Sequence, residues 1–180
     1  MTDFTRRDLF LAAAAITAPL AANAGDLLDF SALEVSSPPK PAPDAKFLRA
    51  DGTEDALANY RGKGVVLNFW ATWCPPCVAE LPSLDRLAAA LAGSNIQVLA
   101  LSEDTGAKAA TVVQNYYAAH GIKQLPVLID RYGRATDAFN DPPVPTTLLI
   151  DARGDIRAKF EGGTNWSAAV AEAKIRAMIG

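Results

Sequence analysis

The clearest feature of the hydrophobic pattern is a change of period between residues 65 and 91. Residues 65–70 are almost continuously apolar and rich in strand-favouring types, which predicts a buried β-strand. Beyond them, apolar residues recur three or four positions apart, which predicts an amphipathic helix: Leu81, Leu84, Leu87, Ala88 and Leu91. The pattern therefore predicts a junction between a central strand and a helix.

Strands and helices alternate along the rest of the chain. Strands are predicted at 46–49, 96–101 and 125–130, a helical turn at 55–60, and helices at 106–120 and 133–139. Two further strands, 146–151 and 155–160, are separated by a short turn, and a helix over 166–179 closes the chain. Alternation implies parallel strands, and the hairpin adds antiparallel ones. The predicted class is α/β, a mixed β-sheet with helices on both faces.

Residues 1–24 have the composition of an export signal peptide. Arg6 and Arg7 precede an alanine-rich apolar run, and Ala22-Asn23-Ala24 supplies small residues typical of a cleavage site. The run is broken by Pro19 and is short for a membrane span. The arginine pair favours a twin-arginine signal, with a general secretory signal as the alternative. We therefore expect a periplasmic or otherwise exported protein.

Residues 25–43 include the proline-rich stretch Ser36-Ser37-Pro38-Pro39-Lys40-Pro41-Ala42-Pro43, which does not favour a helix. The composition favours a passive linker, with an extended segment that wraps the domain as the alternative. The remaining residues, 44–180, form the predicted folded domain and are long enough to bury a core.

Charge and cysteine content narrow the function. The net charge is -3 and the pI is about 5.1, with no basic stripe, so nucleic-acid binding is not expected. Cys74 and Cys77 are too few for a disulfide scaffold, and a bond closing so short a loop would stabilise little. Their C-x-x-C spacing at a strand-to-helix junction instead indicates a redox-active disulfide. We expect neither a cofactor nor a metal ion.

The helix N-terminus gives the two cysteines different roles. Cys74 lies just ahead of the helix, where an anion is stabilised, so its thiolate attacks a partner disulfide. Cys77 then resolves the mixed disulfide from the same helix face. Pro75 and Pro76 have no N–H to donate to the Cys74 sulfur, which favours a reducing poise. The alternative is that these prolines only favour the helix start.

Three motifs together resemble the TlpA/ResA-type thioredoxin-like proteins: Asn68-Phe69-Trp70-Ala71-Thr72-Trp73-Cys74-Pro75-Pro76-Cys77, Glu80-Leu81-Pro82 and Val144-Pro145-Thr146-Thr147-Leu148-Leu149-Ile150-Asp151. The resemblance covers roughly residues 43–180. It implies a thioredoxin-like fold with an extra segment between the second strand and a cis-proline loop. It also implies an exported thiol–disulfide oxidoreductase that reduces partner proteins in cytochrome c maturation or copper-oxidase assembly. A membrane thiol-transfer reductase would supply its electrons.

The resemblance also implies where protein disulfide substrates bind. In this fold Pro145 follows a cis peptide bond, lies against the dithiol and leaves the Val144 backbone free to pair with an extended partner peptide. Trp73 flanks the dithiol as a contact surface. The expected substrate-binding residues are Trp73, Pro75, Pro76, Val144 and Pro145.

Glu80, one helical turn after Cys77, is the candidate proton acceptor. General thioredoxins keep a buried Asp where this chain has Asn68, and an Asn side chain does not titrate. A partly buried Glu80 would have a raised pKa suited to taking the proton of Cys77. The alternative is a solvated carboxylate on the helix surface.

Two rival functions use the same motif. A Cu(I)-binding or metal-delivery module would exploit the soft thiolates, but no His or Met lies near them in the sequence. His120, the single histidine, is expected at the surface beside a helix end. A peroxidase is disfavoured because relatives of that kind carry a differently placed cysteine.

Overall fold

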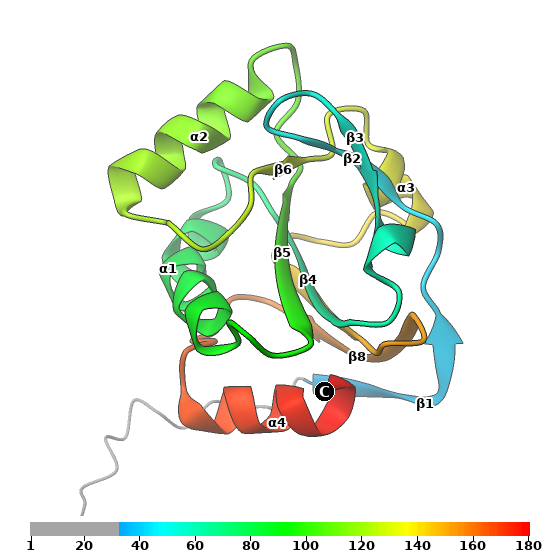
Figure 1. Ribbon diagram of the computed structural model, residues 1–180. Helices are drawn as coiled ribbons and strands as arrows, with labels where there is room; N and C mark the ends of the chain where they lie inside the picture. The colour runs from blue at the N-terminus through cyan, green and yellow to red at the C-terminus, as the bar shows by residue number, and fades with distance from the viewer. Residues whose placement is uncertain (1–32) are drawn as a thin grey trace, which may run out of the picture.

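The computed structural model describes residues 33–180, which build a mixed sheet of eight strands with helices on both sides (Figure 1). The strand order is β1-β8-β7-β4-β5-β6-β2-β3. The export signal predicted for residues 1–24 lies outside the described residues. Within residues 33–180, no helix combines the length and the apolar character that crossing a membrane requires.

The strands are β1 (Leu33–Pro41), β2 (Lys46–Arg49), β3 (Glu54–Ala56), β4 (Gly64–Trp70), β5 (Ile96–Ser102), β6 (Leu128–Ile129), β7 (Thr146–Ile150) and β8 (Asp155–Glu161). The helices are α1 (Pro75–Ala90), α2 (Ala109–His120), α3 (Arg134–Ala138) and α4 (Ala169–Ile179), with a short 3-10 helix, η2, over Leu57–Tyr60. The segment between β5 and β7 thus carries α2, β6 and α3.

Strand β4 is the centre of the sheet, and all seven of its residues are buried. It pairs in parallel with β5, from Gly64 opposite Ile96 to Trp70 opposite Ser102, and antiparallel with β7. A strand covered on both faces accepts an unbroken apolar run, which is the pattern that the sequence shows. The predicted central strand is confirmed, and it ends directly before the dithiol loop.

Apolar clusters cover both faces of the sheet. One cluster joins α1, α2 and α4 to it through side chains such as Leu84, Val113 and Ile175. The other includes Phe47 and Ala135, on the side of β2 and α3. Figure 1 shows α1 and α3 on opposite sides of the central strands. The predicted α/β class with helices on both faces is confirmed.

Several predicted element boundaries are wrong. The strand predicted over 125–130 is confined to β6, because Pro126 has no N–H for a strand ladder. The helix predicted from residue 106 begins at Ala109, since Gly106 has a φ of 88° and cannot start a right-handed helix. The helical turn predicted over 55–60 is divided between β3 and η2.

The proline-rich stretch predicted as a passive linker is largely strand β1. This strand pairs antiparallel with β8, from Leu33 opposite Phe160 to Pro41 opposite Asp155, with an irregularity between Val35 and Lys40. Prolines are tolerated there because β1 is an edge strand, whose outer side needs no ladder donors. The linker prediction is therefore wrong for residues 33–41, and the sheet begins ahead of the boundary predicted at residue 44.

We expect a chain that begins at Leu33 to be more stable than one that begins at Asp44, by about 2 kcal/mol. The shorter chain loses the β1–β8 ladder and the packing of Leu33 against the core. Chemical denaturation of the two proteins measures the difference. Equal denaturation midpoints would show that β1 adds no stability and would restore the linker interpretation.

Candidate functional site

The two cysteines lie where β4 gives way to α1. Cys74 is the N-cap of α1, and Cys77 lies in the helix's first turn. They form a disulfide with their Cα atoms 5.3 Å apart. Strand β4 is buried along its whole length and α1 has a buried face, so two well-packed elements hold the sulfur positions.

The electrostatics of the junction follow from its two prolines. Pro75 and Pro76 occupy the first two positions of α1 and have no N–H. The first backbone N–H of the helix that can donate is that of Cys77. It donates to the Cys74 sulfur, with a donor–acceptor distance of 3.3 Å. The helix N-terminus adds a partial positive charge at the same place. Cys74 thus has one local backbone donor, as its sequence predicts.

Both cysteine residues are buried, whereas several of their neighbours are exposed. Cys77 is fully buried, whereas Cys74 keeps 4% exposure. The predicted contact residues Pro75 and Pro76 are exposed, and Trp73 has 64% of its surface in solvent. The three apolar neighbours of Cys74 in the sequence therefore present surface to solvent, which the predicted contact role requires.

The predicted cis-proline loop lies at the same end of the sheet. The Val144–Pro145 peptide bond is cis. Thr146, the next residue, pairs with Phe69, one position before the end of β4. Val144 is half-buried and packs against the cluster that contains both cysteines. The structure thus brings the predicted substrate-binding residues to the end of the sheet that holds the dithiol.

Glu80 is buried rather than solvated, with 4% of its surface exposed. Its Oε1 accepts a hydrogen bond from Asn68 Nδ2 at 2.8 Å. Its Oε2 accepts from the backbone N–H of Thr164 at 3.1 Å and from Trp166 Nε1 at 3.0 Å. Burial raises the pKa of Glu80 to about 7, and these donors oppose the rise. The alternative of a solvated surface carboxylate is therefore wrong.

The donors from Thr164 and Trp166 were not predicted from the sequence. Both lie in the segment between β8 and α4, more than eighty residues from Glu80. Ser83 anchors that segment: its Oγ donates to the Glu80 carbonyl oxygen at 2.7 Å and accepts from the Trp166 N–H at 2.9 Å. Gly163 allows the close approach, because a Cβ there would lie 3.1 Å from the Pro76 carbonyl oxygen.

A second carboxyl with a raised pKa, Glu103, also escaped prediction. Its N–H donates to the Trp70 carbonyl oxygen at 2.8 Å, so it lies beside the end of β4. Burial, followed by the charges of Asp130 and Asp141, raises the pKa of Glu103 to about 7. Asp141 belongs to the loop that leads to Pro145. The dithiol end of the sheet therefore carries two carboxyls that titrate near neutrality.

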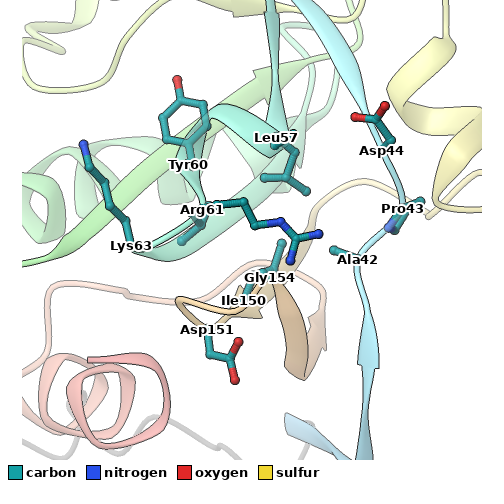
Figure 2. A pocket seen from close by; sticks show the side chains of 12 residues that line it. Ala42, Pro43, Asp44, Leu57, Tyr60, Arg61, Lys63, Ile150, Asp151 and Gly154 are labelled. Atoms are coloured by element: carbon teal, nitrogen blue, oxygen red, sulfur yellow. The ribbon is translucent and has the colours of Figure 1, made fainter.

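A cavity of about 140 Å³ lies at the opposite end of the sheet, beside the start of β4 (Figure 2). Figure 2 shows the Arg61 side chain extending across it toward Gly154. Arg61 donates a hydrogen bond to the carbonyl oxygen of Arg153. Neither cysteine lines this hollow, so the redox chemistry belongs to the dithiol end.

A family model described as the AhpC/TSA family matches residues 38–159. The chain belongs to the AhpC/TSA family. It is 36% identical over 121 residues to the thiol-disulfide oxidoreductase ResA of Geobacillus kaustophilus, with 67% of each chain covered. The predicted resemblance to TlpA/ResA-type proteins is therefore confirmed.

Solved structures of thioredoxin-like proteins share the fold of this chain. A thiol:disulfide interchange protein of the thioredoxin family from Chlorobium tepidum matches with a TM-score of 0.64 and 26% identity, covering 79% of this chain and 97% of that one. The exposed lipoprotein thioredoxin Etrx1 of Streptococcus pneumoniae matches with a TM-score of 0.61 and 30% identity, covering 74% and 98%. The chain is thus a thiol–disulfide oxidoreductase of thioredoxin-like fold with a Cys74–Cys77 pair.

The buried carboxyl of Glu80 should make stability depend on pH. Its pKa is raised from 4.5 to about 7, so between these values the folded state holds a proton that the unfolded chain has released. The free energy of unfolding therefore falls as the pH rises through this window and levels off above it. Glu80→Gln removes this contribution, which is on the order of 3 kcal/mol.

Denaturation of both proteins at about pH 4 and about pH 8 measures the effect. The variant's stability relative to the wild type should increase at the higher pH, while the slope from Glu103 remains in both proteins. A stability difference that does not change with pH would mean that the pKa of Glu80 is the same in the folded protein as in the unfolded chain.

Proposed function

We propose that the protein is an exported reductant of protein disulfides in which Glu80 accepts the proton of Cys77. The observation that carries this proposal is the Glu80 carboxyl itself, with a pKa of about 7 and a position one helical turn from a fully buried cysteine. Burial disfavours a thiolate at Cys77, so its proton needs an acceptor before that sulfur can attack. A carboxylate that titrates near neutrality is suited to the task.

In the proposed reaction, the Cys74 thiolate attacks one sulfur of a partner disulfide. This step forms the Cys74–partner bond, breaks the partner's S–S bond and releases one partner thiolate. Glu80 then takes the Cys77 proton, and the Cys77 sulfur attacks Cys74. The partner leaves as its second thiolate, two electrons have passed to it, and Cys74 and Cys77 are left as the disulfide present in this structure.

The reducing direction is supported by the paucity of local donors at Cys74. Its sulfur is approached by the Cys77 N–H, while the two intervening prolines have none to offer. A thiolate with little stabilisation gives up electrons more readily than one held by several donors. An exported reductant meets an oxidising compartment, so a membrane thiol-transfer reductase must restore its dithiol.

The proposed partners are exported proteins whose paired cysteines must be reduced, as in cytochrome c maturation or copper-oxidase assembly. A partner segment would lie extended across the dithiol, pairing with the Val144 backbone beside Pro145. Trp73, Pro75 and Pro76 would provide the apolar contact, consistent with their exposure. Export would depend on the signal peptide of residues 1–24, which we propose to be a twin-arginine signal.

The proton role of Glu80 predicts a specific pH profile. The resolution step needs ionised Glu80, so the rate of disulfide reduction by the wild type should rise through about pH 7 and then level off. Glu80→Gln should lose this limb and react about tenfold or more slowly at neutral pH. Glu103→Gln, which removes the other carboxyl of raised pKa, should keep the profile. Stopped-flow reduction of a disulfide peptide tests all three.

The reduction potential of the Cys74–Cys77 pair tests the direction of electron flow. Equilibration with glutathione should give a value well below the roughly −120 mV of strongly oxidising relatives of this fold. A value near −120 mV would contradict a reductant and favour an oxidase of partner thiols. Replacing Cys77 with Ser leaves mixed disulfides unresolved, so trapping with this variant identifies the partners directly.

A further inference from the structure

Asn68 has an unused acceptor close to the Glu80 carboxyl. Its side chain is fully buried in β4, and its Nδ2 donates to Glu80 Oε1 at 2.8 Å and to Thr147 Oγ1 at 2.9 Å. Both hydrogens of the amide are therefore in use. The amide oxygen, Oδ1, is buried and has no hydrogen-bond partner within residues 33–180. A buried acceptor left unpaired costs free energy, so this orientation satisfies only half of the amide.

The arrangement fits the ionised carboxylate and not the protonated acid. A carboxylate only accepts, and the groups around it are donors. A protonated carboxyl has an O–H that needs an acceptor, and neither the Thr164 N–H nor the Trp166 indole N–H provides one. The free acceptor beside the carboxyl is Asn68 Oδ1. A half-turn of the amide about its last side-chain torsion would bring that oxygen to face Glu80.

We infer that Asn68 is a positioning residue whose amide turns over when Glu80 gains or loses its proton. This inference rests on the proposed role of Glu80 as proton acceptor. With Glu80 ionised, Asn68 donates to it through Nδ2; with Glu80 protonated, the Glu80 O–H donates to Oδ1. In the protonated form the proton remains bonded to Glu80 while its O–H donates to Oδ1, so the turn of the amide changes hydrogen bonds and transfers no proton to Asn68. One side chain therefore offers a donor to the carboxylate and an acceptor to the acid, and in the second case the NH2 group takes the unpartnered position that Oδ1 now holds.

The turn also reaches the strand that carries the substrate loop. The Thr147 hydroxyl accepts from Asn68 in the present orientation and would donate to Oδ1 in the other, because a hydroxyl does either. Thr147 belongs to β7 and lies two residues after Pro145. Protonation of Glu80 therefore changes the direction of a hydrogen bond on β7, next to the Val144–Pro145 loop.

The hydrogen-bonding groups around the Glu80 carboxyl are uncharged. Thr164 and Trp166 contribute uncharged donors from the segment before α4, and Thr147 contributes a hydroxyl from β7. On α1, Arg86 lines the same groove as Glu80, and the Cys77 sulfur lies one turn away. Cys77 does not titrate while it is in the disulfide. Measurements on the oxidised protein therefore follow Glu80 without interference from the thiol.

Nuclear magnetic resonance of the oxidised full-length protein tests the inference. The side-chain amide of Asn68 and the carboxyl carbon of Glu80 are followed in one sample from about pH 5 to about pH 9. Both should titrate with the same midpoint, near pH 7. The Asn68 signals should cease to titrate in Glu80→Gln. They should keep titrating in the matched control Glu103→Gln, which removes the other carboxyl with a pKa of about 7.

A Glu80 carboxyl that titrates while the Asn68 amide does not change would overturn the inference and leave the proposed function intact. A Glu80 carboxyl that remains ionised down to about pH 5 would overturn the proposed acceptor and the inference with it. These two failures are distinguished within the same experiment, because the two groups are observed separately.

The link to β7 has its own pair of variants. Thr147→Val removes the hydroxyl that contacts Asn68 and should abolish the shift of β7 backbone signals at the Glu80 midpoint. Thr146→Val is the matched control: it removes a buried hydroxyl from the same strand, but one that donates to the Pro143 carbonyl oxygen. Signals in β7 that still titrate in Thr147→Val would refute the link.

Discussion

The hydrogen bonding of one buried carboxyl joins the parts of this protein that matter for its chemistry. Glu80 comes from the dithiol helix, and its partners come from the central strand and from the segment ahead of α4. Burial makes the charged form costly, while the N–H donors recover part of that cost. The acid is therefore poised between its two forms, a condition that a carboxylate in solvent would not meet.

That balance depends on how firmly the dithiol helix is held. Asp85 lies further along α1 than Glu80. Its carboxylate accepts hydrogen bonds from the backbone N–H groups of Lys123, Gln124 and Leu125. The loop after α2 is thereby fastened to α1. On the other side, Ser83 fastens the segment before α4. The helix that carries Cys77 is thus fixed to segments both before and after β7. These contacts hold the Glu80 carboxyl and the Cys77 sulfur in constant relative positions.

The sequence was sufficient for features that depend on local pattern. The apolar run of β4, the helical spacing of α1 and the C-x-x-C between them led directly to the central strand and the dithiol. Glu80 was predicted because it shares a helix face with Cys77. Its partners Thr164 and Trp166 were not, since no periodicity links them to α1 and only the closed fold brings them together. The same holds for Glu103, whose raised pKa comes first from burial and then from the charges of Asp130 and Asp141, which only the folded chain brings together.

Strand β1 was missed because prolines usually argue against strands, and that preference does not apply at a sheet edge.

The prolines of β1 also affect which edges of the sheet can accept another strand. Pro38, Pro39 and Pro41 remove three backbone donors from one margin of the sheet, and at the other margin β3 is three residues long. Neither margin is then a good template for an added strand, whether from another copy or from an unfolded client. The proposed pairing of an extended partner with the backbone beside Pro145 therefore meets little competition from the margins of the sheet.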